Sequence, residues 1–312
     1  MQAFYADQFV LPLPAGHRFP MAKYRMLRDA LLLQCPAIQM QQAPKALPGE
    51  LALAHHPAYI QAIVDGSVDP LILREIGFPW SHAMAERAMR SVGASVAAAR
   101  VARQEGISGN LAGGTHHASA ERGGGFCVFN DMAVTARVLQ TEAWRNERRM
   151  LRVAMIDLDV HQGNGTASIF SRDDSVFTLS LHGAKNFPFR KVRGDLDVDL
   201  PDGCSDVAYM EALHQALADM VSRFDADFVI YQAGADAHEG DRLGRLKLSH
   251  DGMMERDRVV MNWAWQRRCP MILCMGGGYG HDLSSTVQVQ VGTWQVALEY
   301  WKRWQGWHNR GS

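Results

Sequence analysis

Short apolar runs alternate with longer segments of helical periodicity along most of the chain. The apolar runs predict buried strands at residues 3–5, 110–112, 153–156, 176–181, 228–231 and 271–274. Between them, apolar positions three and four residues apart predict helices at residues 24–33, 57–64, 81–104, 132–139, 206–224, 249–267 and 286–301. The segment 34–47 is rich in Gln and Pro and is interpreted as a surface loop.

This alternation of strands and helices predicts an α/β fold, a parallel sheet with helices on both faces. The chain has no internal repeat and no long linker, so we expect a single domain spanning residues 1–312. Each unusual polar cluster follows the carboxyl end of a predicted strand. In open α/β sheets, ligands bind at that edge.

The composition indicates which classes of binding partner to expect. The net charge of −1 implies no general attraction to nucleic acid or to anionic membranes, so we expect no direct nucleic-acid binding. We also expect no secretory signal and no membrane span, because no apolar run approaches about 20 residues. The five cysteines contain no Cys-x-x-Cys pair, which favours reduced thiols in the cytoplasm over disulfides or a thiolate zinc site.

The segment 156–165 contains the strongest candidate chemistry. The predicted strand 153–156 is followed by Asp157, Asp159 and His161, whose side chains would share one face if the chain stays extended to His161. Gly163 and Gly165 then predict a tight loop. Two carboxylates and an imidazole on one side suit a metal ion, although aspartates in a solvated loop can also cap a helix.

Asp159, His161 and Asp236 are the predicted zinc ligands, because catalytic zinc usually keeps three protein ligands and an open position for water. Manganese or iron(II) also suits nitrogen and oxygen ligands. Asp236 lies in the polar, turn-rich segment 234–241, so a helix-capping role is the competing interpretation.

Two further groups suit acid–base and oxyanion chemistry. His116 and His117 follow a predicted strand and two glycines, and their ordinary pKa suits proton transfer. The pair His55-His56 lacks such glycines and is interpreted as structural, so paired histidines alone are a weak signal. Tyr279 follows three glycines, where its hydroxyl could donate to an oxyanion. No Gly-Lys-Ser/Thr or Gly-x-Gly-x-x-Gly motif supports a phosphate loop instead.

Taken together and in order, the motifs resemble the zinc-dependent histone deacetylase family over about residues 15 to 300. The motifs are Gly114-Thr115-His116-His117, Gly124-Gly125-Phe126-Cys127, residues 157–165, Gly234-Ala235-Asp236, Gly240-Asp241 and Gly276-Gly277-Gly278-Tyr279. Gln162 and the sequences at 116–119 and 122–127 look most like the class IV branch and its bacterial relatives. The resemblance implies the arginase–deacetylase fold, with a central, mainly parallel eight-stranded sheet.

The resemblance also implies residue roles. Zn²⁺ would be bound by Asp159, His161 and Asp236, and the catalytic group would comprise His116, His117, Tyr279, Asp157 and Asn164. The substrate channel would be formed by Phe126, Phe187, Gly125 and Gly277. One structural K⁺ would bind at Asp157, Asp159, His161, Ser180 and Leu181, and a second at Phe170, Asp173 and Val176.

Two departures from relatives bear on the expected chemistry. Asn164 stands where some branches have an aspartate. Because an amide stabilises an imidazolium less than a carboxylate does, His117 should have a lower pKa than a carboxylate-paired histidine. The acidic rim residue that grips a substrate peptide backbone in relatives is not identifiable before Ser81.

The implied function is zinc-dependent hydrolysis of acyl groups, acetyl or longer fatty acyl, from the side-chain amine of lysine in proteins or peptides. An acetylpolyamine amidohydrolase, acting on an acylated small amine, is an alternative. An arginase-like enzyme with two manganese ions would need further bridging carboxylates, where this chain has Gln162 and Asn164. A non-catalytic acyl-lysine binding protein would not require both histidines and Tyr279.

Overall fold

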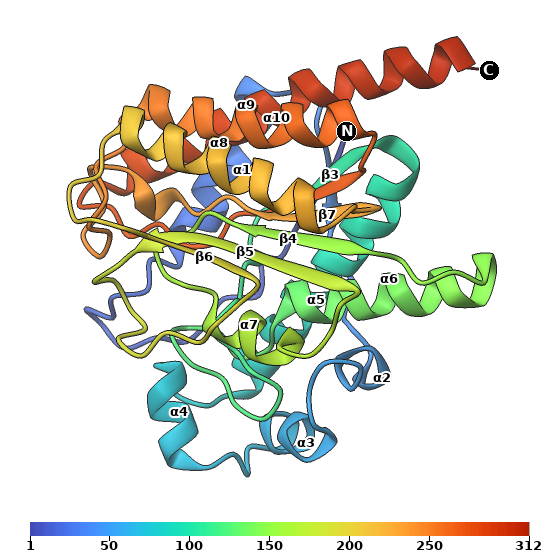
Figure 1. Cartoon of the computed structure of the whole chain (residues 1–312). Coiled ribbons are helices and arrows are strands. Elements are labelled where there is room, and N and C mark those ends of the chain that lie inside the picture. The colour runs from blue at the N-terminus through green and yellow to red at the C-terminus, as the bar shows by residue number, and fades with distance from the viewer. Residues whose placement is uncertain (312) are drawn as a thin grey trace.

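A central eight-stranded sheet, with every strand parallel, organises the computed structural model, which describes residues 1–311 (Figure 1). The predicted α/β fold with an eight-stranded sheet is therefore confirmed. The strand order is β2-β1-β3-β8-β7-β4-β5-β6. The strands are β1 (Gln2–Tyr5), β2 (Gln39–Gln42), β3 (Ile107–Asn110), β4 (Val153–Asp157), β5 (Val176–Gly183), β6 (Leu196–Leu200), β7 (Phe228–Gln232) and β8 (Met271–Cys274).

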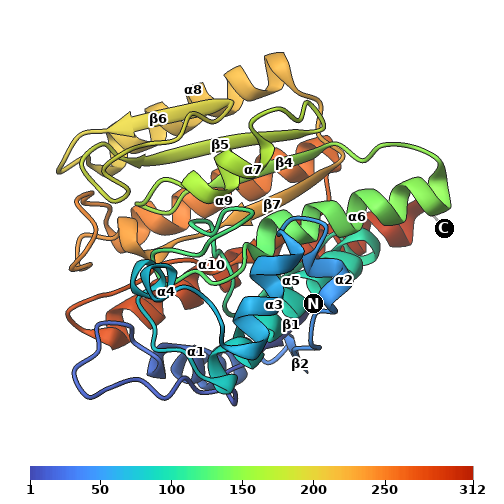
Figure 2. The same cartoon turned by 90° about the horizontal axis from the view of Figure 1, so that it is seen from below.

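Helices cover both faces of this sheet. One layer, above the sheet in Figure 1, consists of α1 (Ala22–Gln34), α8 (Asp206–Arg223), α9 (His250–Arg267) and α10 (Leu283–Gly311). The other, nearest the viewer in Figure 2, consists of α2 (Pro48–Leu51), α3 (Pro57–Asp65), α4 (Pro70–Ile76), α5 (His82–Glu105), α6 (Asp131–Glu147) and α7 (Asn164–Phe170). A short 3₁₀ helix, η1 (Ala235–Ala237), follows β7.

The sheet separates two apolar cores, and β4 contributes to both. Ala154 and Ile156 pack in the core beneath the α8–α10 layer, whereas Val153 and Met155 pack in the core beneath α5 and α6. Because both faces of β4 are buried, its sequence is a continuous apolar run rather than an alternating one. Each fully buried aliphatic side chain of this kind stabilises the fold by roughly 1.5–3 kcal/mol.

The predicted helix ends follow local capping chemistry. Helix α5 begins after Ser81, whose side chain accepts a hydrogen bond from the Met84 amide, and ends at Gly106. Helix α6 begins after Asn130, whose side-chain oxygen accepts from the Ala133 amide at 2.9 Å. Capping residues of this kind satisfy amides that have no partner inside the helix.

The structure corrects the sequence-based assignments at the edges of the sheet. The predicted loop at 34–47 contains the edge strand β2, which pairs in parallel with β1. Its sequence, Gln-Met-Gln-Gln, is largely exposed and lacks the apolar alternation of a half-buried strand. Strand β3 ends at Asn110, so the strand predicted at 110–112 was placed too late. The opposite edge strand, β6, was not predicted at all, because Leu-Asp-Val-Asp-Leu is polar and partly exposed.

The structure bears on two expectations from composition, reduced cysteines and the lack of a membrane span. All five cysteines have free, buried thiols. Among residues 1–311, every helix is too short or too polar to be a membrane span, as expected.

A buried arginine ties helix α9 to the carboxyl edge of the sheet. Arg256 is fully buried and forms an ion pair with Asp257 at 2.8 Å. Its Nη1 donates to the backbone carbonyls of Leu158 at 3.3 Å and Gly234 at 2.7 Å, in the loops that follow β4 and β7. The Asp257 carboxylate also accepts hydrogen bonds from Tyr231 and Thr293. This network holds both loops in place.

Replacing Arg256 with Met should destabilise the protein by about 3–5 kcal/mol, because the Asp257 carboxylate would remain buried without its cation. Equilibrium unfolding in urea measures this loss. Arg145→Met, at an exposed position in the last turn of α6, should change stability by less than about 0.5 kcal/mol. A loss below about 1 kcal/mol in Arg256→Met would show that the loops are held by other contacts.

Candidate active site

Loops at the carboxyl ends of four adjacent strands, β3, β8, β7 and β4, meet at one edge of the sheet. In the register of the sheet, Asp157 at the end of β4 pairs with Gln232 at the end of β7, which pairs with Cys274 at the end of β8. The chain segments that follow these strands contain the histidine pair, the Asp-His motif, Asp236 and Tyr279. Parallel strands therefore bring His116 and Tyr279, 163 positions apart in the sequence, to one edge of the sheet.

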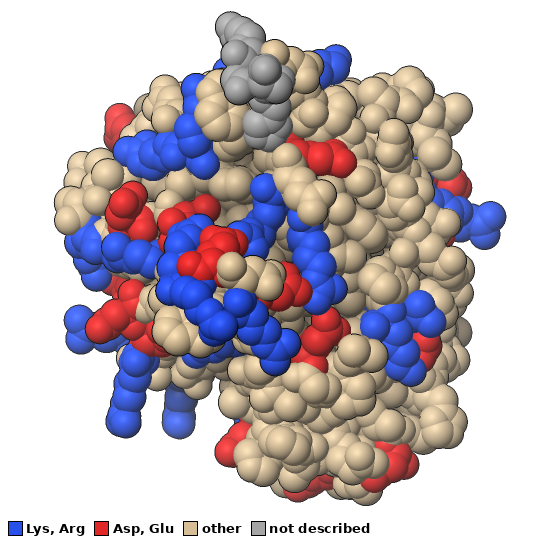
Figure 3. Space-filling view, turned by 90° about the vertical axis from the view of Figure 1, so that its right-hand side faces the viewer, with Lys and Arg blue, Asp and Glu red and all other residues tan. Residues whose placement is uncertain are grey.

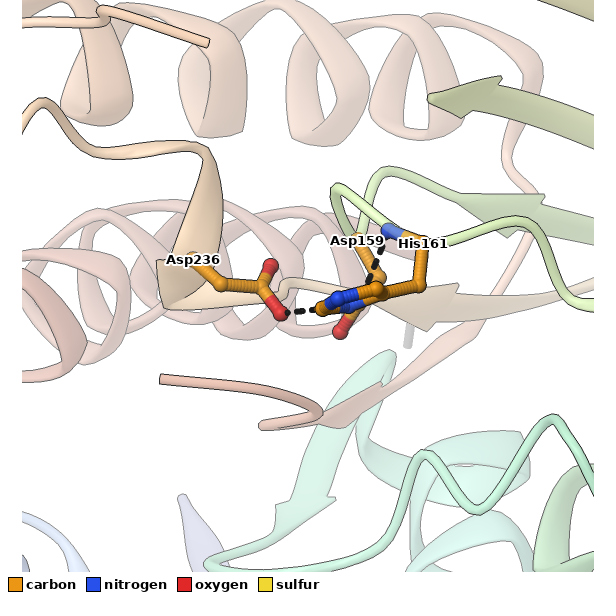
Figure 4. Close-up of side chains that lie close together, drawn as sticks. All are labelled: Asp159, His161 and Asp236. Carbon is orange, nitrogen blue, oxygen red and sulfur yellow. Dashed lines mark hydrogen bonds and ion pairs between the residues drawn. The ribbon is translucent and has the colours of Figure 1, made fainter. Parts of the chain in front are cut away.

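Asp159, His161 and Asp236 form a compact buried cluster (Figure 4). His161 Nδ1 lies 3.0 Å from Asp159 Oδ1 and 3.1 Å from Asp236 Oδ2. One potential ligand atom from each residue lies within 4.8 Å of the others. Strand β4 ends at Asp157, so the extended conformation expected as far as His161 is not kept. The side chains of Asp159 and His161 nevertheless lie close together.

The charge of this cluster fits a bound cation. Burial and the charge of Asp159 raise the pKa of Asp236 to about 7. Burial alone would lower the pKa of His161, but hydrogen bonds to Asp159 and Asp236 raise it to about 10. The two buried carboxylates thus favour positive charge between them. A divalent ion bound there would supply that charge, and metal binding at such ligands releases their protons.

Backbone and side-chain donors orient the two carboxylates. Asp159 Oδ2 accepts from the Gly277 amide at 2.8 Å and from Gln232 Nε2 at 3.2 Å, while Asp236 Oδ1 accepts from the Val160 amide at 2.9 Å. A Cβ atom at Gly277 would lie 1.8 Å from Asp236 Oδ2, so only glycine allows this approach. Each carboxylate therefore keeps one oxygen toward His161.

The two neighbouring histidines have different partners. His116 Nδ1 lies 2.7 Å from Asp157, and His117 Nδ1 lies 2.7 Å from the side-chain oxygen of Asn164. Burial lowers the pKa of His116, but the charges of Asp157 and Asp159 outweigh it and raise the pKa above its ordinary value. Burial and the adjacent His116 and His161 hold the pKa of His117 well below its ordinary value, whereas the hydrogen bond to Asn164 acts in the opposite direction.

Tyr279 is buried beside the cluster, at the end of a glycine loop held at several points. Its amide donates to Asp241 Oδ2 at 2.5 Å. The buried Lys23 on α1 places Nζ 3.3 Å from the Gly278 carbonyl and 5.1 Å from the centre of the Tyr279 ring. Burial raises the pKa of Tyr279 well above its ordinary value, so the hydroxyl keeps its proton and remains a hydrogen-bond donor.

Aromatic side chains line the approach to this centre. The Phe126 ring stacks on Phe78 with centroids 5.4 Å apart, and the Phe187 ring packs edge-on against His117 at 4.9 Å. Gly125 adopts φ +52°, and a Cβ there would lie 2.5 Å from the His117 ring. All four predicted channel residues border this centre: Gly125 and Phe126 line two neighbouring hollows, Phe187 lines one of them and Gly277 lines the other.

Two hollows adjoin at the candidate catalytic side chains, because His117, Gly125, Phe126, His161 and Tyr279 line both. The outer hollow opens past Phe187 to the surface. The inner hollow extends beyond the cluster toward α5, and its far end is lined by Leu11, Met84, Arg87, Ala88, Ser91 and Ala112.

The residues predicted to bind potassium lie near one another. Asp157 and Ser180 are paired across β4 and β5. In the second group, the Phe170 carbonyl accepts from the Asp173 amide at 3.0 Å, and the Asp173 carbonyl accepts from the Val176 amide at 3.2 Å. The Asp173 carboxylate is engaged by Arg137. Potassium binding at either group stays a prediction.

Three supporting residues were missed in the sequence. Gln232, Lys23 and Phe78 contact Asp159, the Tyr279 loop and Phe126 respectively. Gln232 offered a local signal, since it is a polar residue that ends an apolar strand. The contacts of Lys23 and Phe78 are long-range, and their surroundings in the sequence give no indication of them.

Comparison with known proteins supports one family. Residues 17–293 match the histone deacetylase domain. An uncharacterized protein of Picosynechococcus sp. is 41% identical over 285 residues, covering 89% of this chain and 93% of that protein. Histone deacetylase 2 of Arabidopsis thaliana is 36% identical over 193 residues, covering 61% of this chain and 49% of that relative.

A solved structure, described as an HDAC homolog complexed with SAHA, aligns over 97% of this chain and 88% of its own, with a TM-score of 0.79 and 25% sequence identity. The matched domain spans most of the chain and contains every element of the site. The chain therefore belongs to the histone deacetylase family.

Proposed function

We propose that the protein is a zinc-dependent amidohydrolase that removes acyl groups from the side-chain amine of lysine, and that the whole chain forms one catalytic domain. The observation that supports this most strongly is the convergence of a buried Asp-His-Asp cluster, a histidine pair and Tyr279 on one cavity. A non-catalytic acyl-lysine binder would need the cavity, but it would not need this set of proton donors and acceptors beside a metal site.

Asp159, His161 and Asp236 would hold the zinc ion. Zinc bound by three protein ligands polarises a carbonyl oxygen and lowers the pKa of water. The histidine pair handles the protons: His117, which its lowered pKa keeps neutral, accepts the proton of the attacking water and then returns that proton to the departing amine. His117 suits the second role because it lines the outer hollow, through which the lysine stem would enter.

Tyr279 would stabilise the charge that develops on the acyl oxygen. Its hydroxyl keeps its proton because of burial, and the Asp241 hydrogen bond fixes its backbone. A pre-positioned donor of this kind stabilises the oxyanion more than the substrate carbonyl. Phe126 and Phe187 would hold the apolar stem of lysine between them. Structural K⁺ near Asp157 and Ser180, and near Asp173, is part of the same proposal.

Asp236→Asn should lower zinc affinity by roughly tenfold or more, because an amide is a neutral and weaker ligand and even supporting residues are worth 10- to 100-fold. The amide oxygen can still accept from the Val160 amide, so the fold should survive. Zinc per chain, measured by mass spectrometry after dialysis, tests this. The control is Asp202→Asn, an acid that pairs with Arg245 at the surface. Full zinc occupancy in Asp236→Asn would remove this residue from the ligand set.

Tyr279→Phe should lower kcat on an acetyl-lysine peptide by about 100- to 1,000-fold, because it removes one oxyanion donor. The KM should change little, since the ring remains. The matched control is Tyr209→Phe on α8, whose buried hydroxyl has no hydrogen-bond partner within residues 1–311. That variant should retain normal turnover. Normal turnover in Tyr279→Phe as well would assign oxyanion stabilisation to another group.

The inner hollow should admit acyl groups longer than acetyl, because its far end is lined largely by apolar side chains. Each buried methylene contributes up to ~0.8 kcal/mol, so an octanoyl peptide should be hydrolysed with a kcat/KM at least comparable to that of the acetyl peptide. Ala88→Phe would fill this end and should reduce octanoyl hydrolysis more than acetyl hydrolysis. Activity confined to acetyl in the unmodified protein would contradict this extension and leave the deacetylase proposal intact.

A further inference from the structure

The opening of the outer hollow is rich in positively charged side chains. It is lined by the catalytic side chains at its base and by four cations at the surface, Arg18, Arg74, Lys185 and Arg245. Glu75 is the one carboxylate among its lining residues. We call these five residues the rim. Because the chain as a whole has a net charge of −1, this excess of positive charge is local to the rim.

One side of the rim is fastened to the channel wall by the backbone. The Gly125 and Phe126 amides donate to the carbonyls of Glu75 and Ile76, at 2.9 and 2.8 Å. These bonds fix the end of α4, and with it Arg74, beside the channel. His17 Nε2 lies 2.9 Å from the Gly77 carbonyl, which holds the neighbouring Arg18 on the same side.

The other side of the rim consists of two loops joined through Asn186. Its side-chain amide donates to the Leu243 carbonyl at 2.7 Å, and its side-chain oxygen accepts from the Arg245 amide at 3.3 Å. These bonds place Lys185 and Arg245 next to each other. Phe189 lies on this side as well and is 86% exposed, so an apolar surface is available beside the cations.

The nearby carboxylates already have partners. Glu75 forms an ion pair with Arg122 at 3.1 Å, and Asp202 pairs with Arg245 at 3.1 Å and with Lys185 at 3.5 Å. Within residues 1–311, Arg18 and Arg74 form no ion pair. The rim and its immediate partners therefore include five cations and two carboxylates, and the positive excess remains available to a ligand.

The opposite end of the molecule, where the strands begin, has a different arrangement. Figure 3 views that end, and its Lys and Arg side chains are interleaved with Asp and Glu. Arg149, for example, pairs with both Glu147 and Asp227. Arg145, Arg148 and Arg172 lie near this end and also form no ion pair within residues 1–311, so the cations of the rim are distinguished by their place around the entrance to the candidate catalytic centre.

Resting on the proposed function, we propose that the rim selects acyl-lysine in an acidic sequence context, with Asp or Glu within about three residues of the modified lysine. Each such residue advances the peptide by at most about 3.5 Å, so these carboxylates stay near the opening while the lysine occupies the channel. Complementary surface charge raises association rates and discriminates between partners. The same rim repels acylated polyamines, which retain positive charge, so the proposal assigns peptides rather than polyamines to this site.

The test compares two acetyl-lysine peptides of equal length, one flanked by two Glu residues on each side and one flanked by two Lys residues. At low salt, kcat/KM should be roughly tenfold higher for the acidic peptide, and the ratio should fall toward about twofold in 0.5 M NaCl as surface charges are screened. N-acetylspermidine should be a poorer substrate than either peptide. The double variant Arg74→Glu/Arg245→Glu should abolish or invert the preference.

The control is Arg145→Glu/Arg172→Glu, which changes the net charge equally at exposed positions near the amino ends of β4 and β5. It should keep the original preference. Equal rates for the two peptides, an unchanged ratio in the rim variant, or faster hydrolysis of N-acetylspermidine would overturn the inference. Fluorescence anisotropy measures the binding of the same two peptides independently of hydrolysis. If the protein hydrolyses neither peptide, the proposed function is contradicted, and the binding measurement still shows whether the rim discriminates between the peptides.

Discussion

Buried carboxylates at the carboxyl edge of the sheet are the constraint on which this structure depends. Asp157, Asp159 and Asp236 are all nearly inaccessible to solvent, and a buried charge without a partner is strongly unfavourable. His116 lies beside Asp157, and His161 lies between the other two. A metal ion bound as proposed would complete the compensation. The ligand cluster therefore affects folding as well as chemistry, because the same charges must be balanced in both.

The loops that contain these groups are rigid for reasons that lie outside the cluster. Arg256 binds the carbonyls of the two loops that follow β4 and β7, and Lys23 binds carbonyls of the loop that precedes Tyr279. Both cations come from helices of the same layer, α9 and α1. The helices of this layer thus hold the loops that contain the candidate catalytic residues, and α1 also borders the inner hollow through Tyr24. Catalysis by positioned groups requires such support, since small displacements of the reacting atoms are costly.

The sequence predicts the centre of the sheet better than its edges. Strands such as β4 and β7 are buried on both faces, and their apolar runs are unambiguous. The edge strands β2 and β6 are polar, so their formation depends on pairing with a neighbour that periodicity does not reveal. The candidate ligands were predictable because they follow central strands. Gln232 and Lys23 were not, because their contacts depend on how distant loops meet in three dimensions.

Three groups of side chains, each suited to a different part of the proposed substrate, lie at different depths of the cavity. In the proposed function, the metal cluster and Tyr279 would act on the acyl group in a buried environment, the aromatic walls would contact an apolar stem, and the charges of the rim lie in water. Salt screens exposed charges strongly and buried ones weakly. Ionic strength should therefore alter the discrimination between flanking sequences without altering the contribution of Tyr279 to turnover. Such independence is expected when specificity depends on encounter at the surface and rate acceleration depends on groups that are excluded from solvent.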